Sequence, residues 1–213
     1  MPEYDLKAKA GPPIGHNRRD FLRGSGLAAA SAVLANTATQ ALEEVRADEA
    51  EANGVEVLSG TVEVTLNVNN EEMTCNVEPR STLLDTLRHR LDVTGPKRVC
   101  DRASCGACTV LVDDEPIYSC TTLAVSCREH EVRTLESFET DEQGVPYAFL
   151  KNDALMCGYC TPGFVTACKA LLEANPDPSL DEVKQALDGN ICRCGTYIGV
   201  FQAALDAAKA LKG

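Results

Sequence analysis

The sequence lacks several features that would point to common functions. It contains no tryptophan, and no apolar run reaches the roughly 20 residues that a membrane-spanning helix needs. Positive charge is scarce, with 20 lysines and arginines against 32 acidic residues and a formal net charge of −12. This balance argues against nucleic acids and anionic membrane surfaces as partners. The three histidines, His16, His89 and His130, lack the spacing of metal ligands, and His89 is expected on the surface of a helix.

Cysteine, by contrast, is abundant, with 11 in a chain of 213 residues. In an exported protein, disulfides would be the first interpretation. Cys192 and Cys194, however, are separated by a single residue, and a disulfide between them would close a strained ring. Tight cysteine pairs brought together from distant segments suit a metal better.

Eight of the cysteines fall into two sets of four. The first set consists of Cys100, Cys105, Cys108 and Cys120. Its spacing, C-x4-C-x2-C-x11-C, is the plant-type arrangement for a [2Fe–2S] cluster. The small residues Gly106 and Ala107 would let the loop backbone approach the cluster and hydrogen-bond its sulfurs.

The second set supplies four more candidate ligands. It consists of Cys157, Cys160, Cys192 and Cys194. Four thiolates also suit Zn²⁺, but C-x4-C-x2-C and C-x-C match zinc-ribbon spacings poorly. The sequence therefore predicts two [2Fe–2S] clusters, each adding a charge of about −2 when oxidised.

The first 41 residues are predicted to be a twin-arginine export signal. Residues 17–23 (NRRDFLR) are close to the twin-arginine pattern, and an Ala-rich, weakly apolar run follows over 24–41. The alternative is a disordered basic tail with an accidental Arg-Arg pair. Export predicts a periplasmic location, and residues 42–60, which are acidic and poor in large apolar side chains, are expected to be a linker.

Residues 61–140 are predicted to form a β-grasp domain. Alternating apolar residues and turn signals predict strands at 61–68, 71–77, 109–112, 116–119 and 131–135. Ser81 or Thr82 is expected to cap a helix with Leu83, Leu84, Leu87 and Leu91 on its apolar face. The first cysteine set would lie in a loop at the edge of this domain.

Residues 141–213 read as a four-helix domain. Pro162 suits a first helical position, Ser179 and Glu182 form a capping box, and 198–211 make a last amphipathic helix. The second cysteine set falls at two junctions between these helices, which predicts a small bundle closed over a metal centre. The fold class is therefore α+β, with a plant-type ferredoxin domain followed by a helical [2Fe–2S]-binding domain.

Once both sets are laid out, the chain resembles the iron–sulfur subunit of the molybdenum hydroxylases, also called the xanthine oxidase family. The resemblance rests on the motifs at 100–110, 157–163 and 189–197 and covers 61 to about 210. With the twin-arginine pattern, the chain is most similar to small subunits of periplasmic aldehyde oxidoreductases.

The resemblance implies that this chain has no catalytic residues of its own. A separate large subunit would hold a molybdenum–pterin cofactor and hydroxylate an aldehyde or an N-heterocycle. Electrons would pass through the second set, beside the pterin, to the first set, and then to an FAD subunit or a cytochrome. A free-standing ferredoxin-like electron carrier is the alternative.

Three residues depart from the family pattern. Met156 stands where the family usually has the glutamine that reaches the pterin. Val99 and Ala103 stand where the first loop commonly has glycine, and Ala103 would be strained if its φ were positive.

The other candidate residues have simpler interpretations. Cys75, Cys127 and Cys168 are expected to be buried thiols that bind no metal. Arg193, between two candidate ligands, is expected either to tune the adjacent cluster or to pair with an acid. Tyr159 and Tyr197 are expected to pack around the second set.

Overall fold

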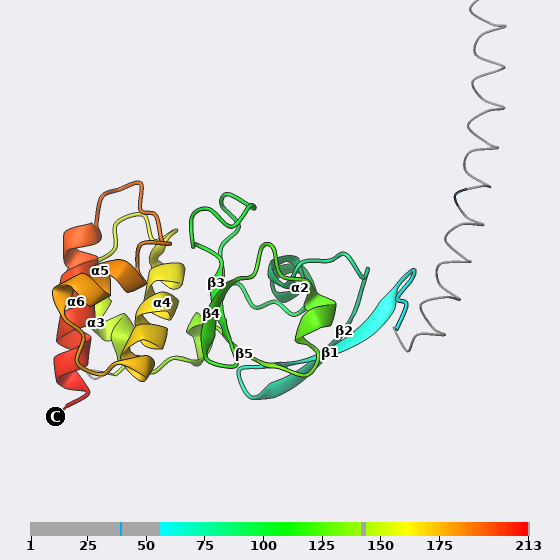
Figure 1. Cartoon of the computed structure of the whole chain (residues 1–213), viewed down its shortest axis with the longest axis horizontal. Coiled ribbons are helices and arrows are strands. Elements are labelled where there is room, and N and C mark those ends of the chain that lie inside the picture. Colours follow the sequence, from blue (N-terminus) through cyan, green and yellow to red (C-terminus); the bar gives the residue numbers. More distant parts are fainter. Residues whose placement is uncertain (1–38, 40–55, 142–143, 213) are drawn as a thin grey trace, which may run out of the picture. The chain divides into compact units, whose positions relative to one another are not determined.

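The computed structural model describes residue 39, residues 56–141 and residues 144–212. The predicted export signal and most of the predicted linker therefore lie outside the described residues. The chain divides between residues 57 and 58, and the C-terminal unit, 58–213, holds both cysteine sets in a mixed α+β structure (Figure 1). Within the described residues, no helix is long and apolar enough to cross a membrane.

A five-stranded sheet with the strand order β2-β1-β5-β3-β4 forms the first half of this unit. Its strands are β1 (Val62–Val68), β2 (Glu71–Val77), β3 (Thr109–Val112), β4 (Glu115–Tyr118) and β5 (Glu131–Arg133). Asn69 and Asn70 join β1 and β2 with φ values of 55° and 65°, which match the twist of a tight hairpin. Strand β5 pairs parallel with β1 and antiparallel with β3, so it joins the two hairpins.

Helix α2 (Leu83–Arg90) packs its apolar face against this sheet (Figure 1). Thr82 caps it, because the Asp85 N–H donates to the Thr82 hydroxyl at 3.1 Å. Buried side chains from β1, β2, α2, β3 and β5 make one core. Its members include Val64, Leu66, Val68, Val77, Leu83, Leu87 and Val110.

The helices of the second half make a separate core. They are α3 (Val145–Lys151), α4 (Thr161–Ala174), α5 (Leu180–Ala186) and α6 (Tyr197–Ala210). The capping box of α5 is present, with the Ser179 side chain on the Glu182 N–H and the Glu182 side chain on the Ser179 N–H. Leu111 of β3 is buried in this helical core, which joins the two halves through α4.

The structure corrects the predicted bounds of β1, β4 and β5 by one or two residues. Strand β4 begins at Glu115 because Asp113 and Asp114, with φ values of 49° and 69°, complete a two-residue turn without it. Strand β5 ends at Arg133 because the Thr134 N–H donates to the side chain of Asn69 at 2.8 Å. The short 3₁₀ helices η1 (Ala124–Cys127) and η2 (Leu135–Ser137) flank β5.

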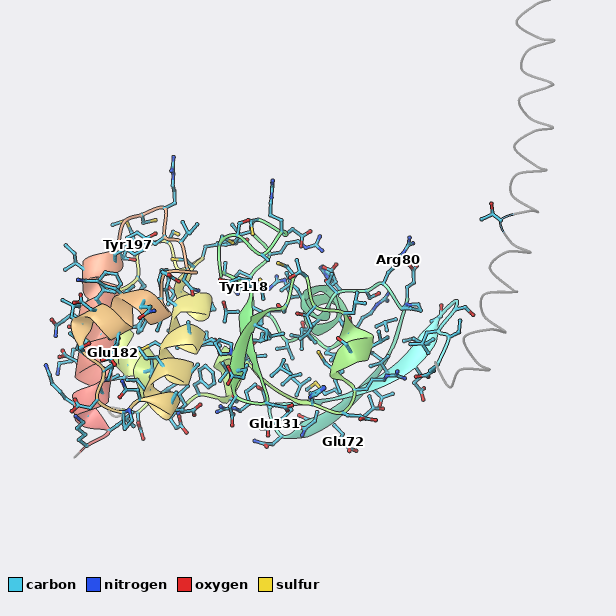
Figure 2. All side chains as sticks on the ribbon, in the orientation of Figure 1. Glu72, Arg80, Tyr118, Glu131, Glu182 and Tyr197 are labelled. Carbon is cyan, nitrogen blue, oxygen red and sulfur yellow. The ribbon has the colours of Figure 1, made fainter. Side chains whose placement is uncertain are left out.

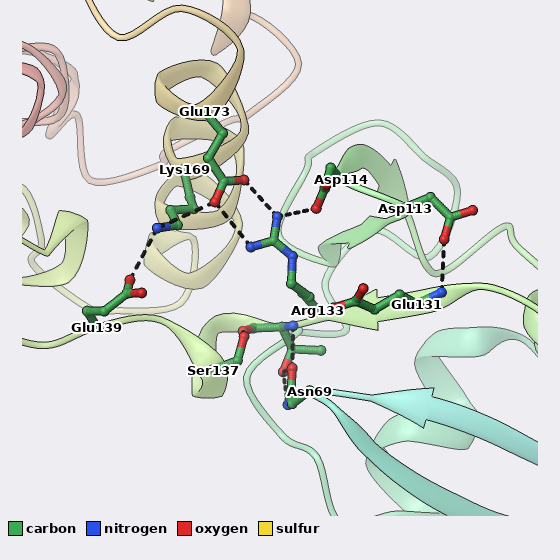
Figure 3. Close-up of polar contacts among 10 residues, drawn as sticks. Asn69, Asp113, Asp114, Glu131, Arg133, Ser137, Glu139, Lys169 and Glu173 are labelled. Atoms are coloured by element: carbon green, nitrogen blue, oxygen red, sulfur yellow. Dashed lines mark hydrogen bonds and ion pairs between the residues drawn. The ribbon is translucent and has the colours of Figure 1, made fainter. Parts of the chain in front are cut away.

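A network of ion pairs ties the C-terminal end of α4 to the sheet (Figure 3). The Arg133 guanidinium contacts both Glu173 oxygens, at 2.7 and 3.1 Å, and Asp114 of the β3–β4 turn at 2.5 Å. Lys169 pairs with Glu173 at 3.5 Å and with Glu139 at 3.1 Å. The side chains of Arg133 and Lys169 are only 18% exposed, so these pairs are less screened by water than surface pairs.

Candidate metal centres

The first cysteine set lies on a loop between α2 and β3 and on the segment after β4. Three residues of the loop adopt left-handed backbone conformations, Asp101, Ala103 and Gly106, with φ values of 57°, 53° and 70°. These turns aim backbone N–H groups at sulfur. The Ala103 N–H lies 3.3 Å from the Cys120 sulfur, and the Ser104 N–H lies 3.4 Å from the Cys100 sulfur.

The four thiols of the first set meet as two pairs. Cys100 contacts Cys105, and Cys108 contacts Cys120, in each case thiol to thiol. Burial opposes ionisation of Cys100, but several backbone N–H groups hydrogen-bond its sulfur and lower the pKa to about 7. Burial raises the pKa of Cys108 to about 12. Cys108 and Cys120 are buried against Leu84 of α2.

The second set comes from two segments that the helices bring together. Cys157 and Cys160 directly precede α4, and Cys192 and Cys194 lie between α5 and α6. Gly158 and Gly195 turn the two segments, with φ values of 81° and 83° that favour glycine. Figure 2 labels Tyr197, the first residue of α6, at this end of the helices.

The second set also meets as two pairs of thiols. Cys157 contacts Cys194, and Cys160 contacts Cys192. Burial raises the pKa of Cys160 to about 12. Burial also opposes ionisation of Cys192, but hydrogen bonds led by the Thr196 hydroxyl lower the pKa of this thiol to about 7.

The two sets are joined by hydrogen bonds between their loops. The Ile191 N–H, next to Cys192, donates to the Cys105 carbonyl at 2.9 Å. The Asn190 side chain donates to the Gly106 carbonyl at 3.0 Å. A side chain at position 106 would collide with Asn190. Glycine is therefore needed there both for the positive φ and for the close approach of Asn190. The Tyr118 hydroxyl, labelled in Figure 2, donates to the carbonyl of Gly189 at 3.1 Å.

The surface around the second set is apolar and open. Met156, Tyr159 and Ile198 are 72%, 57% and 86% exposed, and Ile191 is 52% exposed. Cys157 is itself exposed. Exposed apolar side chains gathered in one place mark interaction surfaces more often than scattered ones do. Of the two tyrosines predicted to pack around the second set, Tyr159 is exposed next to Cys160, and Tyr197 packs edge-on against Phe164.

The remaining predicted residues separate clearly. Cys127 and Cys168 are buried, whereas Cys75 is only partly buried because β2 is an edge strand. His89 is exposed on α2, and His16 lies outside the described residues. Arg193 is exposed and has no ion pair within the described part of the chain.

Two further side-chain contacts were not predicted from the sequence. His130 pairs with Asp113 at 2.5 Å across the sheet edge, and the hydrogen bond from His130 lowers the pKa of the Asp113 carboxyl. The Thr196 hydroxyl lies 3.2 Å from the Cys192 sulfur. Its position four residues after Cys192, at the start of a helix, was the available signal.

The positions of the thiols in this structure fit iron–sulfur clusters. Within the described residues, no three Cys, His, Asp or Glu side chains lie together as a preformed site for a metal ion. The thiols meet in pairs, and each set offers two pairs, as two irons require. The buried Thr161 hydroxyl, next to Cys160, has no hydrogen-bond partner within the described residues, and a cluster sulfur would offer it an acceptor.

Comparisons with known proteins agree with this chemistry. A family model described as a [2Fe-2S] binding domain matches residues 134–205. The iron–sulfur-binding subunit PaoA of an aldehyde oxidoreductase from Escherichia coli K12 is 36% identical over 231 residues, covering 99% of this chain and 97% of PaoA. The nicotine 6-hydroxylase small subunit of Paenarthrobacter nicotinovorans is 42% identical, covering 70% of this chain and 91% of that subunit.

A solved structure shows the same relationship. A chain of quinoline 2-oxidoreductase from Pseudomonas putida 86 superposes with a TM-score of 0.68 at 35% identity, covering 73% of this chain and 99% of that one. The chain therefore belongs to the iron–sulfur subunits of the molybdenum hydroxylases, the xanthine oxidase family, and is an electron-transfer subunit of such an oxidoreductase.

Proposed function

We propose that the two cysteine sets hold two [2Fe–2S] clusters through which this chain relays electrons from a large molybdenum–pterin subunit to an acceptor. A [2Fe–2S] cluster bound by four cysteines takes up and releases one electron at a time. The pairing of thiols in each set supports the assignment. In the first set Cys100 and Cys105 would hold one iron and Cys108 and Cys120 the other.

The same pairing extends to the second set. There Cys157 and Cys194 would hold one iron, and Cys160 and Cys192 the other. The fold proposed for the two sets is a β-grasp ferredoxin domain over 61–140 and a four-helix domain over 141–213. The separate cores of the two halves support that division.

The observation that carries the relay is the hydrogen bond from the Ile191 N–H to the Cys105 carbonyl, 2.9 Å long. It joins the backbone of a ligand of the first set to the neighbour of a ligand of the second set. Asn190 and Tyr118 hold the same two loops together, so the separation of the two sets is fixed by several bonds. A carrier built to pass charge between two centres needs such a fixed junction.

We infer that the large subunit covers the open surface around the second set. The exposed apolar residues Met156, Tyr159, Ile191 and Ile198 surround these cysteines, and an interface of this composition is typical of stable subunit contacts. Because Met156 is a weak acceptor and no donor, it would replace the usual polar contact to the pterin with an apolar one. This surface favours a subunit over a free-standing carrier.

The proposal also covers the order of electron transfer, the substrate of the partner and the location of the protein. Electrons would enter at the second set, beside the partner, and leave from the first set to an FAD subunit or a cytochrome. The substrate oxidised by the partner would be an aldehyde or an N-heterocycle, as the names of the relatives suggest. The twin-arginine pattern at 17–23 supports a periplasmic location.

The test is an iron and sulfide count on the complex purified from its native host, with Cys157→Ser as the variant. The wild-type chain should hold about four irons and four sulfides, and the variant about two of each. The variant should keep the spectrum of the first cluster but no longer reduce it with substrate. Cys75→Ser, a partly exposed thiol outside both sets, is the matched control and should change neither count.

Two results would contradict the proposal. Because a serine oxygen can also bind iron, four irons retained in Cys157→Ala as well as in Cys157→Ser would show that Cys157 is no ligand. A variant that loses two irons yet still reduces the first cluster with substrate would reverse the proposed order.

A further inference from the structure

Thr196 occupies the N-cap position of α6 but does not act as a cap. A threonine there usually accepts a hydrogen bond from a backbone N–H of the first helical turn. The Thr196 side chain makes no such bond, and its backbone (φ −75°, ψ 13°) lies outside the extended region that caps prefer. The hydroxyl lies instead 3.2 Å from the sulfur of Cys192.

The direction of this hydrogen bond follows from the proposed role of Cys192, on which the inference rests. A cysteine that binds iron is a thiolate and carries no hydrogen. The Thr196 hydroxyl must then be the donor and the Cys192 sulfur the acceptor. Cys192 is only 7% exposed, and a hydrogen bond in such a low-dielectric position is stronger than one in water.

The contact is held in place from two sides. The Cys192 N–H donates to the Tyr197 hydroxyl at 2.8 Å, and the Tyr197 ring packs edge-on against Phe164 of α4. Residues 196 and 197 therefore fix both the sulfur and the backbone of one ligand. In the first set, the hydrogen bonds described to ligand sulfurs come from backbone N–H groups, such as those of Ala103 and Ser104. A side-chain donor differs from these backbone donors because a substitution can remove the donor without changing the backbone.

We propose that Thr196 is a positioning residue that acts through Cys192 and raises the reduction potential of the second cluster. Reduction adds negative charge, part of which resides on the ligand sulfurs, so a donor to a sulfur stabilises the reduced state more than the oxidised one. The potential of the second cluster is thereby set by a residue that binds no metal itself. Because this set lies beside the partner, its potential governs how readily the chain accepts an electron.

The test compares Thr196→Val with Thr196→Ser in the purified complex. Valine keeps the branched shape and loses the hydroxyl, whereas serine keeps the hydroxyl. The readout is the midpoint potential of each cluster, followed by electron paramagnetic resonance during a reductive titration with dithionite. We expect Thr196→Val to lower the potential of the second cluster only, and Thr196→Ser to return it towards the wild-type value.

Two controls separate tuning from a structural role. The iron count should stay at about four, and the melting temperature should fall only slightly, because the lost hydroxyl makes one hydrogen bond to sulfur and no cap bond. Should the valine side chain prevent cluster loading, Thr196→Ala, which also lacks the hydroxyl, replaces it. Unchanged potentials in a fully loaded hydroxyl-free variant would overturn the inference. A wild-type chain with only about two irons would instead overturn the proposed function.

Discussion

Both cysteine sets bring their thiols together in pairs, but different parts of the fold position the two sets. The first set is assembled within 21 residues of chain, 100–120, and two of its thiols are buried against α2. The second set exists only because α4 and α6 bring two distant segments together, and Cys157 remains exposed. The first site is therefore a product of local chain geometry, and the second is a product of helix packing. The second site is the more open of the two at its ligands, since Cys157 is exposed whereas no thiol of the first set is more than partly exposed.

The electrostatic pattern is nevertheless shared. Each set has one thiol whose pKa falls to about 7 despite burial, Cys100 and Cys192, because hydrogen-bond donors surround its sulfur. Each also has one thiol whose pKa burial raises to about 12, Cys108 and Cys160. Metal ligands must lose their protons, so one donor in each set is prepared for iron before it binds. Two different backbones therefore each provide one thiol of lowered pKa and one of raised pKa.

The largest effect is expected at the junction between the two regions. Gly163 of α4 lies against the backbone of Gly106 and Ala107, and a side chain there would collide with the Gly106 carbonyl. Because both partners are backbone, neither can move aside cheaply. Gly163→Val should cost about 3 kcal/mol and lower the melting temperature of the complex by about 6–12 °C.

Ala174→Val, at the exposed end of the same helix, is the matched control and should cost less than about 1 kcal/mol. A melting temperature for Gly163→Val equal to that of the control would show that the junction is loose. The contrast between the first site, formed by local chain geometry, and the second site, formed by helix packing, would then lose its structural basis.

The second effect concerns the other end of α4. Arg133→Met would remove the cation that holds Glu173 and Asp114 together, and should cost about 2 kcal/mol because Arg133 is only 18% exposed. The hydrogen bond and charge of Arg133 lower the pKa of Glu173. A lowered carboxyl pKa contributes stability above the ordinary value near 4.3, and this contribution is lost as the pH falls. The wild-type chain should therefore lose more stability than the variant between about pH 5 and pH 3.

Thermal melts across that pH range measure the prediction. Arg80→Met removes the solvent-exposed pair with Glu78, so it should leave both the melting temperature and its pH dependence nearly unchanged. Parallel pH profiles for wild type and Arg133→Met would mean that Glu173 is not held by this cation.

Much of the first region could be predicted from its sequence because its contacts are local. The β1–β2 hairpin, the Thr82 cap and the order of the first cysteine set follow from residues close together in the chain. The capping box of Ser179 and Glu182 is equally local and was found for the same reason. The second set was recognised from its motif, which identifies the ligands without showing how they meet.

The bonds that join the regions could not be predicted in the same way. Cys105 meets Ile191, and Arg133 meets Glu173, only after the helices pack against the sheet. Even the end of β5 depends on Asn69, a residue far away in the sequence. These contacts are determined by tertiary packing, so the spacing of residues in a single sequence does not predict them.

The smallest expected effect is a gain in stability, and it tests the backbone of the first loop directly. Ala103 has a φ of 53°, where the second set uses Gly158 and Gly195 at its own positive-φ turns. A left-handed alanine costs about 1–2 kcal/mol, partly offset by the greater freedom of glycine in the unfolded chain. Ala103→Gly should therefore raise stability by about 0.5–1 kcal/mol and the melting temperature by about 1–4 °C.

The sign of this change matters more than its size. The Ala103 N–H that donates to the Cys120 sulfur is retained in the glycine variant, so the cluster contact itself is unaltered. Ser104→Gly, next to it but without a positive φ, should lower the melting temperature, because glycine there adds freedom in the unfolded chain and removes the hydrogen bond from the Ser104 hydroxyl to the Arg102 carbonyl. Opposite signs at adjacent residues would locate the strain at Ala103, whereas a loss at both would mean that the loop carries none.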